Sequence, residues 1–445
     1  MTERGAERGV ERGVDRGIVG TVPTLRSHPL RASLSEEMHV RKLPQLAAPL
    51  RLMQIVTLMD EDGIAASQAH VVALCAEHGA GPDPASRYFV CRLDGHDFVW
   101  ERHTEVATYT FVATGHAGAA FGCEPFGDAV NRWVAGLPGE VLRATHVALV
   151  EQDADVAPLI THFAMDDLVV CDVAQGRARI WSDFRLHADG FGRLVVRDQG
   201  LVGYEAAQLV QRLQELGNYR NMALLGLPLA QRLTPEVSRL EQRLATLTAA
   251  VAERVSQDDT LLDELSFLSA QLARLMAETS YRLSATRAYA QLSSDRLAAL
   301  QVGEVRGHPT LADFTARRLA PAVRTCESFS HRLEGLSQRV AWTSSLLRTR
   351  VDTALARQNR DLLDSMDRRT GVQVRLQQAV EGLSVVAISY YLVGLFGYVV
   401  KSMHGIGPVP PEVATGMAVP VVIALVAFVM ARIRRHAHAH ARGGA

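Results

Sequence analysis

The chain has 445 residues, of which 48% are hydrophobic, enough to build two or three folded domains and still fill a bilayer. Lys and Arg number 47 against 48 Asp and Glu, so the formal net charge is −1 and the basic surplus typical of nucleic-acid-binding proteins is missing. This composition excludes a wholly disordered chain and argues against nucleic acid as a partner.

The N-terminal residues carry closely spaced charges and no long apolar run, so we expect no signal peptide. Residues 1–22 repeat a Glu/Asp-Arg-Gly pattern and predict a disordered charged tail. The five cysteines are scattered and form no CxxC pair that starts a zinc site or a redox dithiol, which favours a reducing, cytosolic setting. They are Cys75, Cys91, Cys123, Cys171 and Cys326.

Residues 23–200 have the pattern of a mixed α/β cytosolic domain. Apolar residues at helical spacing predict a helix over 63–78. Runs rich in β-branched and aromatic residues, separated by short turn-like stretches, predict strands, and the first three of these should form antiparallel hairpins. The expected strands are 87–93, 97–104, 105–112, 144–150, 168–173, 178–184 and 193–196.

Past residue 200 the strand signal ends, and residues 201–381 predict a stalk of long helices. Apolar residues follow alternating steps of four and three, a heptad seam that Arg254 and Asp258 interrupt. We expect a long helix up to about Ala299, a break at 307–309, and a second, antiparallel helix from about Leu311. The seam fits packing within one chain or between copies. Its residues are Leu240, Leu244, Leu247, Val251, Leu261, Leu265, Leu268, Leu272 and Leu275.

Two uncharged segments, 382–400 and 413–431, predict a transmembrane hairpin, because roughly 20 apolar residues cross a bilayer core of roughly 30 Å. Arginines flank the outer ends of the hairpin, whereas the connecting loop carries only Lys401. The positive-inside rule therefore places both termini in the cytoplasm, with the spans in the inner membrane. Residues 432–445 form a basic His/Arg tail that meets anionic headgroups.

Small and hydroxyl-bearing residues inside the spans are the candidate functional positions. They suit close helix contact or the lining of a pore. Pro420 lacks a backbone donor and frees a carbonyl near Gly416. Neither span has an ionisable residue at its centre, which argues against a proton-coupled transporter. The positions are Ser384, Ser389, Tyr390, Tyr391, Gly394, Gly397, Tyr398 and Pro420.

One set of residues, Glu101, His103 and Glu105, resembles an acid/base or metal site if all three lie on one face of a strand. A charged solvent face with cross-strand ion pairs produces the same pattern, and we favour that interpretation. A metal-dependent hydrolase that uses His103 and Glu105 is the least favoured hypothesis.

Two further sets carry metal-ligating side chains, but neither has the spacing of an HExxH zinc site. The alternating C-terminal histidines are better explained as a titratable segment beside the headgroups. With no nucleotide-binding or nucleophile motif in view, we expect no enzyme activity, no cofactor and no resident metal. The N-terminal set is His28, Glu36, Glu37 and His39, and the C-terminal set is His436, His438 and His440.

Several stretches resemble a bacterial family of membrane-anchored proteins known as domain of unknown function 3422. Local departures are Gly217-Asn218, where the family has an acidic residue and Thr, and Val106, where it has Phe. The resemblance spans nearly the whole chain after the tail and implies the anchor but no activity. The matching stretches are His-Pro-Leu-Arg at 28–31, Glu-Met-His at 37–39, Trp-Glu-Arg-His-Thr-Glu at 100–105, Asp-Phe-Arg at 183–185, 219–228 and 376–391.

The order of parts is also similar to that of CorA-type magnesium channels, although their Gly-Met-Asn signature is replaced by Gly-Tyr-Val-Val-Lys at 397–401. We therefore expect an α+β protein that acts as a non-enzymatic membrane scaffold, sensor or assembly factor. A CorA-like oligomeric cation channel is the alternative. In addition to the lipid bilayer, we expect a second copy of the chain as a partner, and a cation only in the channel hypothesis.

Overall fold

The computed structural model describes residues 26–31, 34–35, 46–76, 81–82, 86–93, 95–115, 121–122, 126–253, 258–402 and 410–442. The chain divides into two compact units. The first lies within residues 1–243 and 269–338, and the second lies within 244–268 and 339–445. The predicted tail, 1–22, lies outside the described residues.

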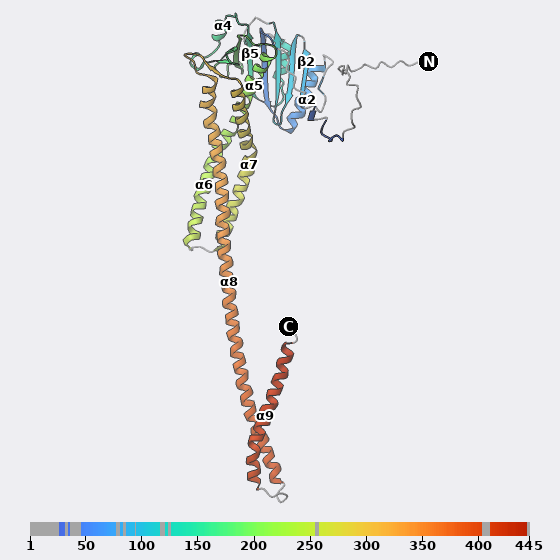
Figure 1. Cartoon of the computed structure of the whole chain (residues 1–445), viewed down its shortest axis with the longest axis vertical. Coiled ribbons are helices and arrows are strands. Elements are labelled where there is room, and N and C mark those ends of the chain that lie inside the picture. Colours follow the sequence, from blue (N-terminus) through green and yellow to red (C-terminus); the bar gives the residue numbers. More distant parts are fainter. Residues whose placement is uncertain are drawn as a thin grey trace, which may run out of the picture. The chain divides into compact units, whose positions relative to one another are not determined.

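The first unit contains a mixed sheet, which in the described part of the chain has nine strands in the order β2-β3-β4-β1-β5-β8-β7-β6-β9 (Figure 1). Neighbouring strands are antiparallel, except for the parallel pair β5 and β8. The strands are β1 (Leu50–Leu58), β2 (Tyr88–Leu93), β3 (His96–Arg102), β4 (Val106–Thr114), β5 (Glu140–Val150), β6 (Val169–Val173), β7 (Ala178–Ser182), β8 (Gly192–Asp198) and β9 (Gly303–Glu304).

The helices of the described chain include short ones between strands and long ones after the sheet. The short elements are α2 (Glu61–Ala76), α3 (Gly127–Ala135), α4 (Ala157–Ile160) and the 3-10 turn η2 (Met165–Asp167). The long helices are α5 (Glu205–Leu224), α6 (Gly226–Glu253), α7 (Asp258–Ala299), α8 (Leu311–Ser402) and α9 (Pro411–Arg442).

Strand β1 lies inside the sheet and divides two apolar cores. Successive side chains of a strand point to opposite faces. Leu50 and Leu52 accordingly belong to a core that α5 covers, with Leu213 among its members. Met53 and Ile55 face a second core that includes side chains of α2 and α3. All residues of β1 except the last are buried, including the polar Arg51, Gln54 and Thr57.

The predicted strands are all present, with ends that differ by a few residues. The mixed α+β class is confirmed. β-branched and aromatic residues were reliable signals here because each strand packs at least one face against a core. The helix predicted over 63–78 is α2, displaced by two residues.

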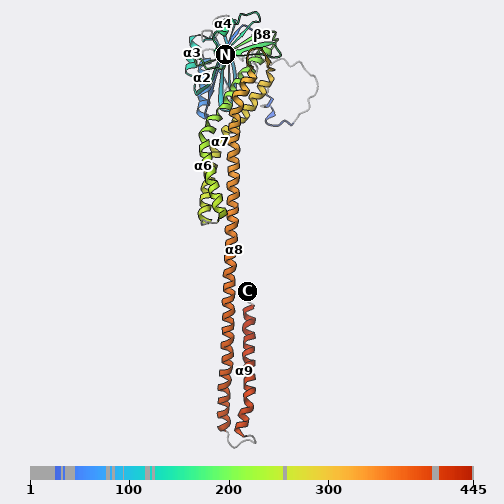
Figure 2. The same cartoon turned by 90° about the vertical axis from the view of Figure 1, so that its left-hand side faces the viewer.

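The single long helix expected up to Ala299 is wrong, because the region after the sheet contains α5, α6 and α7. The interruption of the heptad seam marks the end of α6 and the start of α7. Arg232 on α6 pairs with Glu278 on α7 at 2.8 Å, and Arg274 on α7 pairs with Glu236 on α6 at 3.0 Å. Residue numbers rise on one helix as they fall on the other, so the two helices are antiparallel neighbours (Figures 1 and 2).

The second long helix begins at Leu311, as predicted, after the turn that contains Gly307 with φ of +85°. Its first turn is capped reciprocally. The amide of Asp313 donates to Thr310 Oγ1 at 3.1 Å, and the amide of Thr310 donates to Asp313 Oδ2 at 3.0 Å. Leu311 is buried in the same core as α5. From this anchored start, α8 continues without a break to Ser402.

Two helices of the described chain are long and apolar enough to cross a membrane. The apolar part of α8 is the predicted segment 382–400, and the second candidate covers Thr415–Arg432 within α9. We call these two parts the C-terminal helix pair. Pro420 lies inside α9 and does not end it. Residues 403–409 of the predicted loop lie outside the described residues.

Candidate functional site

A pocket of about 160 Å³ opens in the first unit beside the parallel strands β5 and β8. Its wall also includes α5, the loop between β7 and β8, and the first residue of α8. We call it the arginine pocket because of its four arginines, Arg143, Arg185, Arg193 and Arg220. Its other lining residues are Leu142, Ala144, Thr145, Ile180, Ser182, Phe184, Leu186, Gly192, Leu194, Leu213, Leu216, Gly217, Asn221 and Leu311.

Arg143 reaches from β5 toward α5, where it meets neutral partners. Its Nη1 donates to Asn218 Oδ1 at 2.9 Å and to Gln54 Oε1 at 3.4 Å. The amide of Asn218 also donates to Gln54 Oε1, at 3.1 Å. Gly217 leaves the space that the guanidinium occupies, since a Cβ at this position would lie 2.7 Å from Arg143 Cζ. The contacts orient the guanidinium without neutralising it.

Arg220 on α5 lies beside a stacked pair of aromatic rings. Its Cζ is 4.7 Å from the centroid of Phe184 and 5.3 Å from that of Phe314, which stack on each other at 4.5 Å. Such cation–π contacts favour the charged form. Its Nη1, however, is buried and has no hydrogen-bond partner among the described residues. An unsatisfied buried donor is costly, and a bound acceptor would relieve that cost.

Burial changes the titration of both arginines. Burial and, to a smaller extent, repulsion from Arg220 together lower the pKa of Arg143 to about 9. Burial alone lowers the pKa of Arg220 to about 10. Both groups still carry their charge at pH 7, so the pocket holds two positive charges close together.

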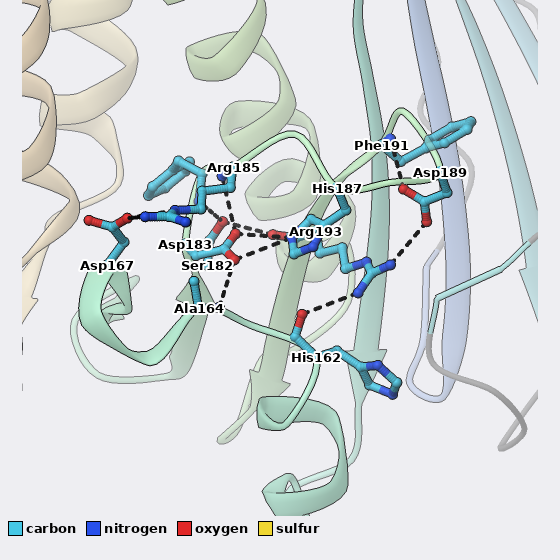
Figure 3. A network of polar contacts seen from close by, with 11 residues as sticks. His162, Ala164, Asp167, Ser182, Asp183, Arg185, His187, Asp189, Phe191 and Arg193 are labelled. Atoms are coloured by element: carbon cyan, nitrogen blue, oxygen red, sulfur yellow. Dashed lines mark hydrogen bonds and ion pairs between the residues drawn. The ribbon is translucent and has the colours of Figure 1, made fainter.

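The other two arginines have acidic partners (Figure 3). Arg185 Nε donates to Asp167 Oδ2 at 2.6 Å, and Arg193 Nη2 donates to Asp189 Oδ2 at 3.0 Å. Burial raises the pKa of Asp189, but hydrogen bonds from the Phe191 amide and from Arg193 lower it by more. The pKa of Asp189 therefore lies below its ordinary value. These pairs are compensated, and the uncompensated charge of the pocket belongs to Arg143 and Arg220.

The buried carboxylate of Asp183 holds the loop that forms the pocket rim. It accepts hydrogen bonds from the amides of Ala164 at 3.0 Å and Arg185 at 3.1 Å, and it contacts His187 Nε2 at 3.2 Å (Figure 3). Phe184, the next residue, has φ of +51°, a conformation that costs a side-chain-bearing residue roughly 1 kcal/mol. The centroid of the Phe184 ring lies 4.7 Å from the guanidinium carbon of Arg220.

In the C-terminal helix pair, some of the predicted membrane positions face α9 and others are exposed. Ser389 is buried against α9, and a methyl group placed on Gly397 would lie 3.5 Å from Thr415 Cγ2. Tyr391 and Tyr398 point away from α9 and are 75% and 77% exposed. Of the remaining positions, Tyr390 and Gly394 are also exposed, and the half-buried Ser384 donates its hydroxyl to Val380 O at 2.8 Å.

A family model described as "Protein of unknown function (DUF3422)" matches residues 26–437. The chain belongs to this family. The match includes the sheet, the long helices and both members of the C-terminal helix pair. A comparison with curated proteins found no match to this DUF3422 chain.

Glu101, His103 and Glu105 do not share one strand face, the condition on which the least favoured hypothesis of a metal or acid/base site depended. β3 ends at Arg102, so the backbone turns before Glu105. His103 Nε2 does lie 3.6 Å from Glu101 Oε1. Glu105 is buried and pairs with Arg282 on α7 instead, so the favoured interpretation as a solvent face is also wrong for this residue.

Most side chains of the two histidine sets lie outside the described residues. The amide of Leu30 donates to His28 Nδ1 at 3.2 Å on the surface, whereas Glu36, Glu37 and His39 lie outside the described residues. The backbone of His436, His438 and His440 belongs to α9, but their side chains lie outside the description. Within the described ranges, no three His, Cys, Asp or Glu side chains are grouped to hold a metal ion.

Two of the scattered cysteines meet in the fold. Cys75 on α2 and Cys91 on β2 have their sulfur atoms 3.5 Å apart and remain unbonded thiols. The mutual contact and burial raise the pKa of the Cys91 thiol well above its ordinary value. A raised pKa makes a thiol a poor nucleophile, so this contact is a packing feature.

The arginine pocket was not predicted, although two of its elements were noticed as motifs. The stretches 183–185 and 219–228 contain Phe184 and Arg220, but their roles depend on neighbours far along the chain. An arginine inside an apolar segment, such as Arg143 between Leu142 and Ala144, was the available signal.

Proposed function

We propose that this DUF3422 protein is a non-enzymatic sensor or scaffold that two spans hold in the cytoplasmic membrane, with both termini in the cytoplasm. The supporting observation is the continuity of α8. The helix begins at Leu311 in the core of the sheet and includes the apolar segment 382–400. We infer that a displacement of the buried start of α8 is passed along the continuous helix to its apolar segment. A change at the sheet therefore reaches the bilayer.

The charge pattern supports the orientation. Arg368, Arg369 and Arg375 precede the first apolar segment and Arg432 follows the second, whereas Lys401 is the sole charge between 382 and 411. Lys and Arg concentrate on the cytoplasmic side of spans. The sheet and the C-terminal residues then share the cytoplasm, and the short connection lies outside.

The exposed tyrosines support self-association. Tyr391 and Tyr398 are seven positions apart on the face of α8 opposite to α9. A hydroxyl in the hydrocarbon core needs a hydrogen-bond partner, and another helix supplies one. We propose that a second copy of the chain covers this face.

Cysteine accessibility tests the anchor and its orientation. A Ser402→Cys variant of the full chain should react with a membrane-impermeant maleimide added outside intact spheroplasts. An Ala445→Cys variant should react only after permeabilisation, and the unsubstituted chain gives the background of the native cysteines. Labelling of Ala445→Cys from outside would contradict the orientation, and extraction of the chain by alkaline carbonate would contradict the anchor.

The same exposed face is compatible with a CorA-like oligomeric cation channel. In that alternative, Ser384, Tyr391 and Tyr398, spaced by seven residues, would line a pore between several copies. Mass measurement in detergent separates the two hypotheses. A monomer or dimer excludes the pore, because one or two hairpins do not enclose a channel. A closed ring that passes cations in liposomes would replace the sensor or scaffold proposal.

A further inference from the structure

We propose that the arginine pocket binds a small oxyanion, either phosphate or a short carboxylate of similar size, through the guanidinium groups of Arg143 and Arg220. This inference deepens the sensor function by naming its ligand class. It rests on that function only for the link between the pocket and the membrane. The binding itself requires no more than the first unit.

The unpaired positive charge of the pocket is the first observation that supports an anionic ligand. Arg185 and Arg193 are paired with Asp167 and Asp189, whereas in the described part of the chain Arg143 contacts neutral amides and Arg220 contacts aromatic rings. Two like charges in a partly buried site are unfavourable unless an anion joins them. The uncompensated pair is therefore best explained by a negatively charged ligand.

The placement of the guanidinium donors is the second observation that supports oxyanion binding. A guanidinium presents a planar fork that matches the oxygens of a phosphate or carboxylate. The stacked rings of Phe184 and Phe314 contact Arg220 from one side, and its Nη1 lacks a partner among the described residues. Asn218 and the space beside Gly217 hold Arg143 in place. Both arginines are thus oriented before a ligand arrives.

The size and lining of the pocket are the third observation, and they favour a small ligand. A volume of about 160 Å³ is enough for a single phosphate or for a carboxylate with a short apolar body. Thr145 and Asn221 add polar groups to the wall, and Leu194 and Leu311 add apolar ones.

The pocket also touches the start of α8. Leu311 lines it, and Phe314, one turn later, stacks with Phe184 and lies 5.3 Å from Arg220. An anion that draws Arg220 toward itself changes this aromatic contact. The first turn of α8, which is anchored in the same core, then receives the displacement.

Thermal unfolding of the full chain in detergent tests the binding at constant pH and ionic strength. Potassium phosphate should raise the Tm in a saturable manner relative to potassium chloride, because a ligand of the folded state stabilises it. Sulfate and succinate distinguish the sources of the oxyanion. A larger response to succinate identifies a carboxylate, and a larger response to phosphate or sulfate identifies a tetrahedral anion.

Substitutions locate the site. Arg220→Met keeps an apolar stem beside the rings but removes the fork, so the affinity measured by titration calorimetry should fall by about tenfold or more. Without anion its Tm should equal or exceed that of the unsubstituted chain, since a buried uncompensated charge is removed. Arg318→Met is the matched control: Arg318 is exposed and lies over the ring of Phe314 at 5.6 Å, so its loss should leave the affinity unchanged.

Three results would overturn the inference. The first is a Tm that responds to phosphate, sulfate and succinate no more than to chloride. The second is an undiminished response in Arg220→Met, which would place the anion elsewhere. If Arg220→Met does not fold, Arg220→Lys replaces it, because lysine keeps the charge but lacks the fork. The third contradicting result is an unchanged anion affinity in Arg220→Lys. None of these measurements depends on labelling from either side of the membrane. The anion-binding proposal and the membrane-anchor proposal can therefore be contradicted independently.

Discussion

Arg282 on α7 donates through Nη2 to Glu105 Oε2 at 2.6 Å, which joins two residues that are 177 positions apart. The side chains are 24% and 8% exposed. The pair fixes the turn between β3 and β4 against the long helix. It uses a carboxylate that the sequence pattern had suggested for the solvent face of a strand.

We predict that Glu105→Gln lowers the free energy of unfolding by about 3 kcal/mol, because it leaves the largely buried Arg282 without its counter-charge. Denaturant unfolding of the full chain in detergent measures this loss. Glu278→Gln is the control, since its partner Arg232 is 63% exposed, and it should change the free energy by less than about 1 kcal/mol. Equal effects of the two substitutions would show that the burial of Glu105 has no energetic consequence.

We predict that Gly226→Ala destabilises the first unit by about 1 to 3 kcal/mol. An added Cβ would overlap Thr286 Oγ1 and lie 3.2 Å from Thr286 Cβ, where α6 approaches α7. Thr286→Ala in the same chain should recover part of the loss. In Gly335→Ala the new methyl group meets no atom within 4 Å, so this change should stabilise the helix by up to about 1 kcal/mol. A neutral Gly226→Ala would contradict the close contact.

We predict that stability falls as the pH drops from 7 to 5, in part because of His146. This side chain is 3% exposed and stacks on Phe191 at 4.2 Å. Burial lowers its pKa from 6.5 to about 4, while Asp189 raises it and Arg193 lowers it. The unfolded chain therefore binds a proton below pH 6.5 that the folded chain does not.

His146 should account for about 2 kcal/mol of stability lost between pH 7 and pH 5. The Tm of His146→Gln should accordingly depend less on pH than that of the unsubstituted chain. His331→Gln, which changes a side chain that is 74% exposed, should keep the full dependence. The assignment to His146 fails if both variants follow the unsubstituted chain.

We predict that Tyr391→Cys forms a disulfide between two copies of the chain in membranes treated with a permeant oxidant. The reason is that this face of α8 points away from α9 and requires a partner in the bilayer. Val393→Cys, on the half-buried face, should cross-link much less. Dimers are counted by nonreducing electrophoresis against the unsubstituted chain. Equal cross-linking at both positions would contradict an interface at the tyrosine face.

Much of the fold could be read from local patterns. Strands β2 to β8, the helix start at Leu311 and the apolar segment 382–400 each have a repeat or a composition that reports their own burial. The division of the expected helix at Glu253 was missed because the heptad continues on both sides of the interruption. A repeat of apolar residues records which face is buried, but not whether the chain reverses between two such runs.

The arginine pocket depends on contacts between distant parts of the chain. Arg143 meets Asn218 across 75 positions, and Phe184 meets Phe314 from a different element. No periodicity predicts such pairs, since each residue alone resembles an ordinary charge or core aromatic. Their proximity results from the parallel placement of β5 and β8 and from the packing of α5 on the sheet.

The sequence by itself determined the class of the fold, the two apolar helices at the C-terminus and membership of the family, because these depend on composition and on patterns within single elements. Only the tertiary structure decided that Glu105 joins Arg282 and that Arg143 and Arg220 share one pocket. The physical reason is that the role of a charged residue depends on how deeply it is buried and on which groups it contacts. Both are set when elements far apart in the chain pack together.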